Sequence, residues 1–224
     1  ASDVYKRQNK QVKQEAADYV SLMTPVVKAF FTDMGSEITS DAMQIFGGYG
    51  YTKDQGIEQL YRDNRITPIY EGTNSIQAID LVFRKLVNKN GDIIDRYINM
   101  IKEDVEKNNN EKLSPFIKIL NNNLEKLISF TSWIKDKIQN SKDDANAACN
   151  DYLKVLGLIS VGYSWIKVLQ VSFNDYENNK IFYEDKIRTA NFFFQRVLPR
   201  IDTHCLSAMS GSQYIMDCLL YTSP

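Results

Sequence analysis

The sequence predicts an all-α protein made of two successive helical bundles. The 224 residues include only ten glycines and five prolines, a scarcity that favours long helices over a strand-rich fold with many turns. Apolar residues recur at intervals of three and four along most of the chain, which is the period of a helix with one buried face. No stretch shows strand-length alternation, and no tandem repeat is present.

Composition and charge exclude several classes of protein. The chain is 43% hydrophobic and 25% charged, as an ordinary soluble protein is. Its net charge of -1 argues against a nucleic-acid-binding protein. No apolar run approaches the ~18 residues of a membrane span, and the start carries no secretory signal. We therefore expect a cytoplasmic protein without a nucleic-acid partner or a membrane span.

The cysteines and the histidine offer little material for a metal site. Cys149, Cys205 and Cys218 lack the spacing of metal or redox motifs and are expected to be reduced thiols. His204 is the only histidine. No metal site and no histidine-based triad is therefore expected.

The two ends of the chain share one DNA sequence. The codons GAT GTG TAT AAG AGA CAG encode DVYKRQ (residues 3–8), and their reverse complement, read from its second base, encodes CLLYTS (residues 218–223). Such a pair resembles the ends that a transposase adds to DNA fragments before sequencing. Residues 1–8 and 218–224 are therefore expected to be tails outside the fold, and the protein segment to be cut at both ends.

The first bundle is expected over residues 9–88. Residues 9–23 have the pattern of the end of a helix. A second helix is expected from Thr24, with Pro25 in its first turn, and it should stop at the glycines of residues 47–52.

The rest of this bundle is predicted to be a short helix, an extended turn and a longer helix. The short helix spans about residues 56–64. Pro68 should force Thr67 into an extended conformation, and Thr73 is a plausible N-cap for a helix over about residues 74–88.

A polar stretch at residues 88–92 marks the boundary to a second bundle, expected over residues 89–217. Its predicted helices cover residues 113–138, residues 146–173 and residues 180–198, the last ending before Pro199. The first carries an apolar stripe formed by Leu113, Phe116, Ile117, Leu120, Leu124, Leu127, Ile128, Ile134 and Ile138. Three long amphipathic runs joined by short polar turns predict an antiparallel bundle.

Side chains of the second bundle are predicted to serve packing. The middle run contains three small residues that would allow close packing, Gly157, Ser160 and Gly162. Five aromatic residues are predicted to belong to the core rather than to a ligand site: Tyr163, Trp165, Phe192, Phe193 and Phe194. This half shows no recognisable chemistry.

Two glycine-containing segments interrupt the helical pattern of the first bundle, QIFGGYGYT (residues 44–52) and IYEGTNSIQ (residues 69–77). Glycine near a helix boundary lets a backbone approach a phosphate or a cofactor closely, but the first segment by itself also suits a simple helix stop. Glu71, in the second segment, by itself also suits a solvated charge that interacts with a helix dipole.

Taken together, these segments carry a family resemblance. The order QIFGGYGYTKD, EQLYRDNRI and IYEGTNSIQ resembles the C-terminal four-helix-bundle domain of the acyl-CoA dehydrogenases, over about residues 20–88. The stretches LMTPVVKAFFTD and AIDLVFRKL, and the further helices to about residue 217, resemble the branch with an additional C-terminal helical domain. That branch includes the 3-methylmercaptopropionyl-CoA dehydrogenases.

The resemblance implies roles for nine residues. It implies that Glu71 is the catalytic base, and that Tyr70 and Gly72 line the thioester end of the substrate. It implies that Thr73, Asn74 and Ser75 lie against FAD. It further implies that Gln44, Gly47 and Gly48 contact the FAD of a neighbouring subunit.

The implied reaction removes the α-proton of an acyl-CoA and transfers the β-hydride to FAD, giving a 2-enoyl-CoA. A weakly acidic α-proton needs a positioned, partly desolvated base, and the N–H of Glu71 would stabilise charge on the thioester oxygen. The resemblance also implies an electron-transfer flavoprotein as acceptor and a homodimer or homotetramer. A chain without the flavin-binding domains is not expected to be active alone. The alternative is a noncatalytic helical interaction module derived from the same fold.

Overall fold

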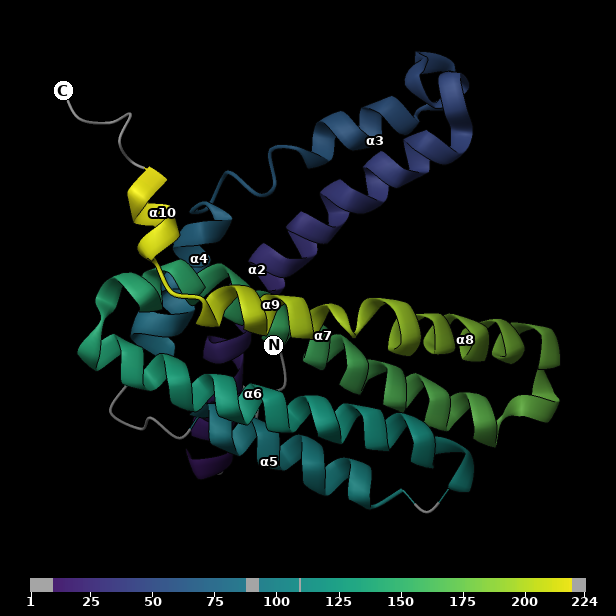
Figure 1. The fold of residues 1–224 in the computed structure, drawn as a ribbon. Coiled ribbons are helices and arrows are strands. Elements are labelled where there is room, and N and C mark those ends of the chain that lie inside the picture. The colour runs from purple at the N-terminus through teal and green to yellow at the C-terminus, as the bar shows by residue number, and fades with distance from the viewer. Residues whose placement is uncertain (1–9, 88–92, 109, 219–224) are drawn as a thin grey trace. The chain divides into compact units, whose positions relative to one another are not determined.

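The computed structural model describes residues 10–87, 93–108 and 110–218. Every regular element in these ranges is helical (Figure 1), which confirms the predicted all-α class. The expected tails, apart from Cys218, and the expected boundary at residues 88–92 lie outside the described residues. Contacts divide the chain into two compact units, Ala1–Lys85 and Leu86–Pro224.

The first unit is a long helix against which shorter helical segments pack. Its elements are α2 (Lys10–Phe46), η1 (Gly47–Tyr51), η2 (Lys53–Gln55), α3 (Ile57–Asn64), α4 (Asn74–Asp80) and the π-helical turn η3 (Leu81–Lys85). α3 returns along α2 after the glycine turn (Figure 1). α4 and η3 also contact α2, so α2 is the scaffold of this unit.

The expected helix start at Pro25 is wrong, because α2 continues through this residue. A proline inside a helix removes one backbone hydrogen bond and costs about 3 kcal/mol. Leu22, Val26, Ala29 and Phe30 are buried on both sides of Pro25, and their spacing continues one helical stripe across it. Burial of this continuous stripe offsets the cost of the proline.

The second unit is a helical bundle. Its elements are α5 (Ile93–Glu106), η4 (Glu111–Leu113), α6 (Ser114–Asn140), α7 (Lys142–Asn174), η5 (Tyr176–Asn178), α8 (Lys180–Phe192), the π-helical turn η6 (Phe193–Val197), α9 (Arg200–Met209) and α10 (Gln213–Asp217). Only Ser141 separates α6 from α7, and the two helices run antiparallel (Figure 1). α7 contacts α6, α8 and α9, so it is the central helix of the predicted bundle.

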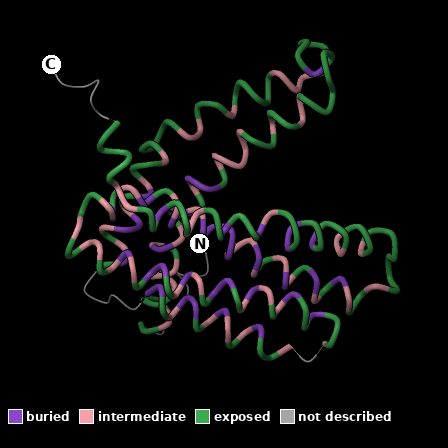
Figure 2. Tube along the Cα trace, in the orientation of Figure 1, coloured by how far each residue is buried: buried purple, intermediate pink, exposed green. Residues whose placement is uncertain are grey.

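The core of this bundle follows the predicted stripe of α6. Its members Leu113, Phe116, Leu120, Leu124, Leu127 and Ile134 are buried, whereas Ile117, Ile128 and Ile138 are half-buried. Buried positions line the inner faces of these helices (Figure 2). A Cβ on Gly162 would lie 3.3 Å from Leu120 Cδ1 and 3.6 Å from Leu198 Cδ1, which explains a small residue at this position of α7.

This unit differs from the prediction in one aromatic residue and in its number of helices. Phe193 and Phe194 are buried, Tyr163 and Trp165 are half-buried, and Phe192 is 61% exposed. Phe192 is therefore not a core residue. Three further helices, α5, α9 and α10, were not predicted as separate elements.

α7 also satisfies a length and composition test for a membrane span. Its most apolar window has a mean hydropathy of 1.4, and 50% of that window is buried within the structure. Core helices of soluble proteins pass the same test, so this observation is weak evidence for a membrane span.

Candidate functional site

The segment between α3 and α4 is a tight series of turns. The backbone N–H of Tyr70 donates to Ile66 O at 3.2 Å, and the N–H of Asn74 donates to Pro68 O at 3.1 Å. The second bond closes a loop around Glu71 and Gly72. Thr73 takes the predicted N-cap position of α4, but its side chain makes no capping hydrogen bond.

Glu71 and Gly72 both adopt left-handed backbone conformations. The φ angle of Glu71 is +56° and that of Gly72 is +83°. Glu71 is the only non-glycine residue with a positive φ in the described part of the chain. Glycine adopts this conformation freely, whereas an L-residue pays roughly 1–2 kcal/mol for it. The acid at this position is therefore held in a strained turn.

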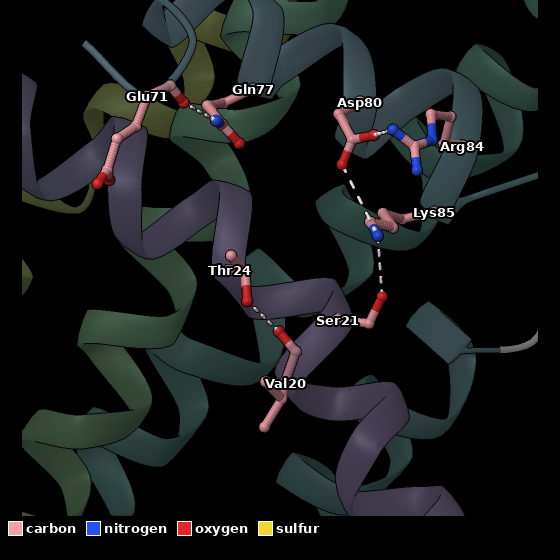
Figure 3. Close-up of polar contacts among 8 residues, drawn as sticks. All are labelled: Val20, Ser21, Thr24, Glu71, Gln77, Asp80, Arg84 and Lys85. Atoms are coloured by element: carbon pink, nitrogen blue, oxygen red, sulfur yellow. Dashed lines mark hydrogen bonds and ion pairs between the residues drawn. The ribbon is translucent and has the colours of Figure 1, made fainter. Parts of the chain in front are cut away.

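Two side-chain donors hold the carbonyl groups of this turn. The amide Nε2 of Gln77, on α4, donates to Glu71 O at 2.9 Å (Figure 3). The ammonium of Lys28, on α2, donates to Gly72 O at 2.7 Å. The peptide groups that follow Glu71 and Gly72 are thus fixed from two helices.

The side chain of Glu71 is left accessible by this arrangement. Its side chain is exposed, and its carboxylate extends away from Gln77 (Figure 3). Its backbone N–H donates to no described residue. Tyr70 is 49% exposed, and Gly72 is exposed as well. One acid and an aromatic side chain are therefore exposed next to each other in the chain.

Asn74 differs from its neighbours because its side chain is engaged within the unit. Its Nδ2 donates to Ala29 O at 3.1 Å, Thr32 Oγ1 at 2.9 Å and Asp33 Oδ1 at 2.6 Å. Its Oδ1 accepts from Lys28 Nζ at 2.7 Å. The Asn74 side chain organises the loop, whereas Thr73 and Ser75 are exposed.

The other predicted site residues lie at the far end of the α2–α3 hairpin (Figure 1). Gln44, Gly47 and Gly48 are exposed, and a Cβ on either glycine would meet nothing within 4 Å. Gln44 is separated from Asp33 by about 16 Å of helix axis at 1.5 Å per residue. Within one chain, these residues do not share a cluster with Glu71.

Large apolar side chains surround the glycine turn. Ile45 is 85% exposed, Phe46 49%, Tyr49 70% and Tyr51 78%. One surface depression, of about 630 Å³, lies beside this turn. Another, of about 430 Å³, lies in the second unit. Contiguous exposed apolar residues of this kind are typical of surfaces that contact another protein surface.

The residues that hold the turn were not predicted from the sequence. Lys28, Thr32, Asp33 and Gln77 make its hydrogen bonds. Three of them, Lys28, Thr32 and Asp33, are polar residues on one side of the otherwise apolar stretch PVVKAFFTD. This pattern is the feature of the sequence that could have indicated them. The described residues contain no group of three or more His, Cys, Asp or Glu side chains that could hold a metal ion.

Family comparisons agree with this division into two helical parts. The family described as "Acyl-CoA dehydrogenase, C-terminal domain" matches residues 4–86. The family described as "Acetyl-CoA dehydrogenase C-terminal like" matches residues 97–218. The chain belongs to the acyl-CoA dehydrogenase family, and its two parts correspond to C-terminal domains of that family.

Curated relatives include a 3-methylmercaptopropionyl-CoA dehydrogenase of Ruegeria pomeroyi. It is 42% identical over 91 residues, which cover 41% of this chain and 16% of that protein. The broad-specificity linear acyl-CoA dehydrogenase FadE5 of Mycobacterium tuberculosis is 29% identical over 190 residues, covering 80% of this chain and 31% of that protein. The chain thus spans less than a third of the length of these relatives.

Solved structures share the fold. Acyl-CoA dehydrogenase from Bacillus anthracis, complexed with FAD, matches with a TM-score of 0.65 at 18% identity, over 84% of this chain and 33% of that chain. Caenorhabditis elegans ACDH-11 in complex with C11-CoA matches with a TM-score of 0.62 at 21% identity, over 81% of this chain and 29% of that chain. These matches agree with the all-α fold.

Proposed function

We propose that this chain is the C-terminal part of an FAD-dependent acyl-CoA dehydrogenase in which Glu71 is the catalytic base. The observation that carries the proposal is the strained conformation of Glu71, with φ +56° in a turn held from two helices. Strained non-glycine residues persist where the surroundings over-determine them, and they cluster at active sites.

In this proposal, the Glu71 carboxylate takes the proton from the α-carbon of an acyl-CoA. The free backbone N–H of Glu71 donates to the thioester oxygen, where negative charge develops as the C–H bond breaks. Tyr70 and Gly72 line this end of the substrate. Bound FAD would supply the acceptor for the hydride of the β-carbon, and loss of this hydride and of the α-proton would leave the α,β-double bond of a 2-enoyl-CoA.

The residues of this chain fit FAD as part of the edge of its site. Gly47 and Gly48 expose backbone with open space where a Cβ would stand, which suits a close approach by a cofactor. Thr73 and Ser75 are exposed at the start of α4. The Asn74 side chain already has hydrogen-bond partners within the unit, so these contacts do not support its predicted contact with FAD. That contact stays a prediction.

The whole enzyme is proposed to be a cytoplasmic homodimer or homotetramer that acts in fatty-acid metabolism. The separation of the Gln44 segment from Glu71 within one chain supports a contact with the FAD of a neighbouring subunit, as do the exposed Ile45 and Tyr51. An electron-transfer flavoprotein is the proposed acceptor of the electrons. Because the chain spans under a third of its relatives, the flavin site would be completed by other domains.

The test is Glu71→Gln in a full-length enzyme that joins this chain to the upstream domains of the family. Glutamine keeps the size and the backbone N–H but cannot accept the α-proton. Loss of a general base costs roughly 10²- to 10⁴-fold in rate. Under anaerobic mixing with saturating acyl-CoA, the oxidised flavin band should disappear quickly in the wild type and persist in the variant. Disappearance within about tenfold of the wild-type rate would remove Glu71 as the base.

A second candidate function is a noncatalytic helical interaction module. The exposed apolar residues around Ile45 and Tyr51 favour it, because they suit a docking surface with or without catalysis. The gene sequence upstream of this segment distinguishes the two, since only an enzyme requires an intact flavin-binding region there.

A further inference from the structure

A single lysine of α2 bridges the turn that carries Glu71. Lys28 Nζ donates to Gly72 O at 2.7 Å and to Asn74 Oδ1 at 2.7 Å. Both contacts are charge-assisted hydrogen bonds, which are stronger than neutral ones. The lysine therefore attaches both Gly72 and the start of α4 to one point of α2.

The Lys28 side chain is held in the orientation that makes this bridge possible. Asn74 reaches α2 at Ala29 O, Thr32 Oγ1 and Asp33 Oδ1, so its Oδ1 is turned toward Lys28. Thr32 Oγ1 also donates to Lys28 O at 2.7 Å. Lys28 and Asn74 are part of one network, which is anchored on consecutive turns of α2.

The network acts where the backbone is strained. Two successive left-handed residues, Glu71 and Gly72, would relax in an isolated peptide, because the L-residue gains roughly 1–2 kcal/mol by leaving that conformation. The bond from Lys28 fixes the carbonyl group of Gly72. With the peptide group between Gly72 and Thr73 fixed, the backbone of Glu71 has less freedom to leave its left-handed conformation.

We propose that Lys28 is a positioning residue for Glu71, an inference that rests on the proposed function of that acid. Lys28 acts through the turn: it fixes the peptide group after Gly72, so that the Glu71 carboxylate and N–H keep one geometry toward the substrate. The turn without Lys28 still folds, since Gln77 and the Asn74 N–H retain their bonds. It then populates conformations in which the carboxylate is displaced from the α-proton.

The first arm of the test uses the chain alone and requires no activity. Lys28→Met removes the two donated bonds but keeps the length of the side chain, and Lys118→Met, at an exposed position of α6, is the matched control. Hydrogen exchange followed by NMR should show the Asn74 amide exchanging at least about tenfold faster in Lys28→Met, because opening of this loop becomes easier. Amides of α2 around Ala29 and all amides of Lys118→Met should exchange as in the wild type.

The second arm measures flavin reduction in the full-length enzyme. A displacement of about 1 Å at a reacting group can cost 10²-fold in rate, so Lys28→Met should reduce its flavin roughly 10- to 100-fold more slowly. Its dissociation constant for acyl-CoA should change less than about threefold, since the chain spans under a third of its relatives and the other domains would supply most of the binding surface. An α-deuterated acyl-CoA should show a kinetic isotope effect at least as large as in the wild type, because proton removal limits the rate.

The outcomes separate this inference from the proposed function. If Glu71→Gln lowers the rate but Lys28→Met stays within threefold of the wild type, the positioning role is wrong. It is equally wrong if affinity, melting temperature and rate fall together, which marks a purely structural lysine. If Glu71→Gln keeps the wild-type rate, the proposed base is wrong, and the exchange of the Asn74 amide still reports whether Lys28 holds the turn. Lys28→Gln replaces Lys28→Met in both arms if the methionine variant does not fold.

Discussion

The side-chain amide of Gln77 donates a hydrogen bond of 2.9 Å to the backbone oxygen of Glu71, six residues earlier in the chain. Gln77 lies in the first turns of α4, so the helix that follows the acid also holds the peptide group directly after it. A Cβ on Gly72 would lie 3.3 Å from this same amide nitrogen. The glycine therefore leaves the room that this contact needs.

Gln77→Ala should affect catalysis more than stability. Glu71 is exposed, so water can replace the lost donor, and the free energy of unfolding should fall by less than about 1 kcal/mol. In the full-length enzyme, flavin reduction should slow by about tenfold, because the peptide group after Glu71 is released on one side. Chemical denaturation and stopped-flow absorbance measure the two effects. Gln139→Ala, at an exposed position of α6, should change neither, and a tenfold slowing in that control would discredit the comparison.

Glu71→Gly should stabilise the chain while abolishing the proposed activity. Glycine removes the left-handed strain of roughly 1–2 kcal/mol but adds about 0.5–1 kcal/mol of chain entropy to the unfolded state. We therefore expect the free energy of unfolding to rise by up to about 1 kcal/mol. Asp41→Gly, at an exposed helical position of α2, should instead lower it by about 1 kcal/mol. Equal losses in the two variants would show that Glu71 is not strained.

Thr131 and Tyr152 share a buried hydrogen bond in the second unit, and replacing one or the other should lower the free energy of unfolding by unequal amounts. Thr131 Oγ1 donates to Leu127 O at 2.7 Å, so the Tyr152 hydroxyl, 2.8 Å away, donates to Thr131. Tyr152→Phe leaves Thr131 satisfied and should cost about 1 kcal/mol. Thr131→Val leaves a buried phenol without a partner and should cost more, about 1–3 kcal/mol.

The double variant completes this measurement. Adding Thr131→Val to Tyr152→Phe should cost much less than Thr131→Val does in the wild type, because no unpaired hydroxyl remains. Urea denaturation of the four proteins gives the coupling free energy. Additive costs would mean that the two hydroxyl groups do not interact in solution.

Asp144, at the start of α7, should make the stability of the second unit depend on pH in the acidic range. The backbone N–H of Ser212 and the Lys137 ammonium, at 2.9 Å and 3.0 Å, hold the pKa of the Asp144 carboxyl well below its usual range. A depressed folded pKa adds stability above the unfolded pKa of about 3.9, and this stability is lost as pH falls toward the folded value.

Asp144→Asn should therefore lower the melting temperature most at neutral pH. The difference from the wild type, roughly 2–5 °C near pH 7, should shrink as the pH is lowered from 5 to 2. Thermal unfolding followed by circular dichroism measures it. Asp143→Asn changes the neighbouring exposed acid and is the matched control. A constant difference for Asp144→Asn would contradict the lowering of the Asp144 pKa by Ser212 and Lys137.

Helical periodicity was sufficient to predict the long helices. The stripe from Leu113 to Ile134 is recognisable in the sequence because residues at this spacing share one face, and the structure buries most of them. Pro25 was misinterpreted because local rules treat proline as a helix start, whereas packing of Leu22 and Phe30 on one stripe decides the outcome. Phe192 was misassigned because a run of three aromatic residues does not indicate which of them faces the core.

In the candidate site too, local sequence predicts some features, whereas others depend on contacts between distant parts of the chain. The motif around Glu71 identifies the acid, and Gly72 marks a left-handed turn that local sequence rules can recognise. The contacts of Lys28 and Asp33 with Asn74 join residues about 40 positions apart, so no local pattern predicts them. They depend on where α4 meets α2, which only the folded unit defines.

The hydrogen bonds that join Gly72 and Asn74 to α2 all lie between Lys28 and Asp33. The middle of this helix should therefore tolerate a change in length less well than its start. Inserting one residue rotates all later side chains by about 100° around the helix axis. An insertion between Lys28 and Asp33 would thus move one part of the network away from Asn74, while an insertion near Lys10 would leave the network intact. The helix can therefore gain or lose residues at its start, whereas its middle is fixed in register.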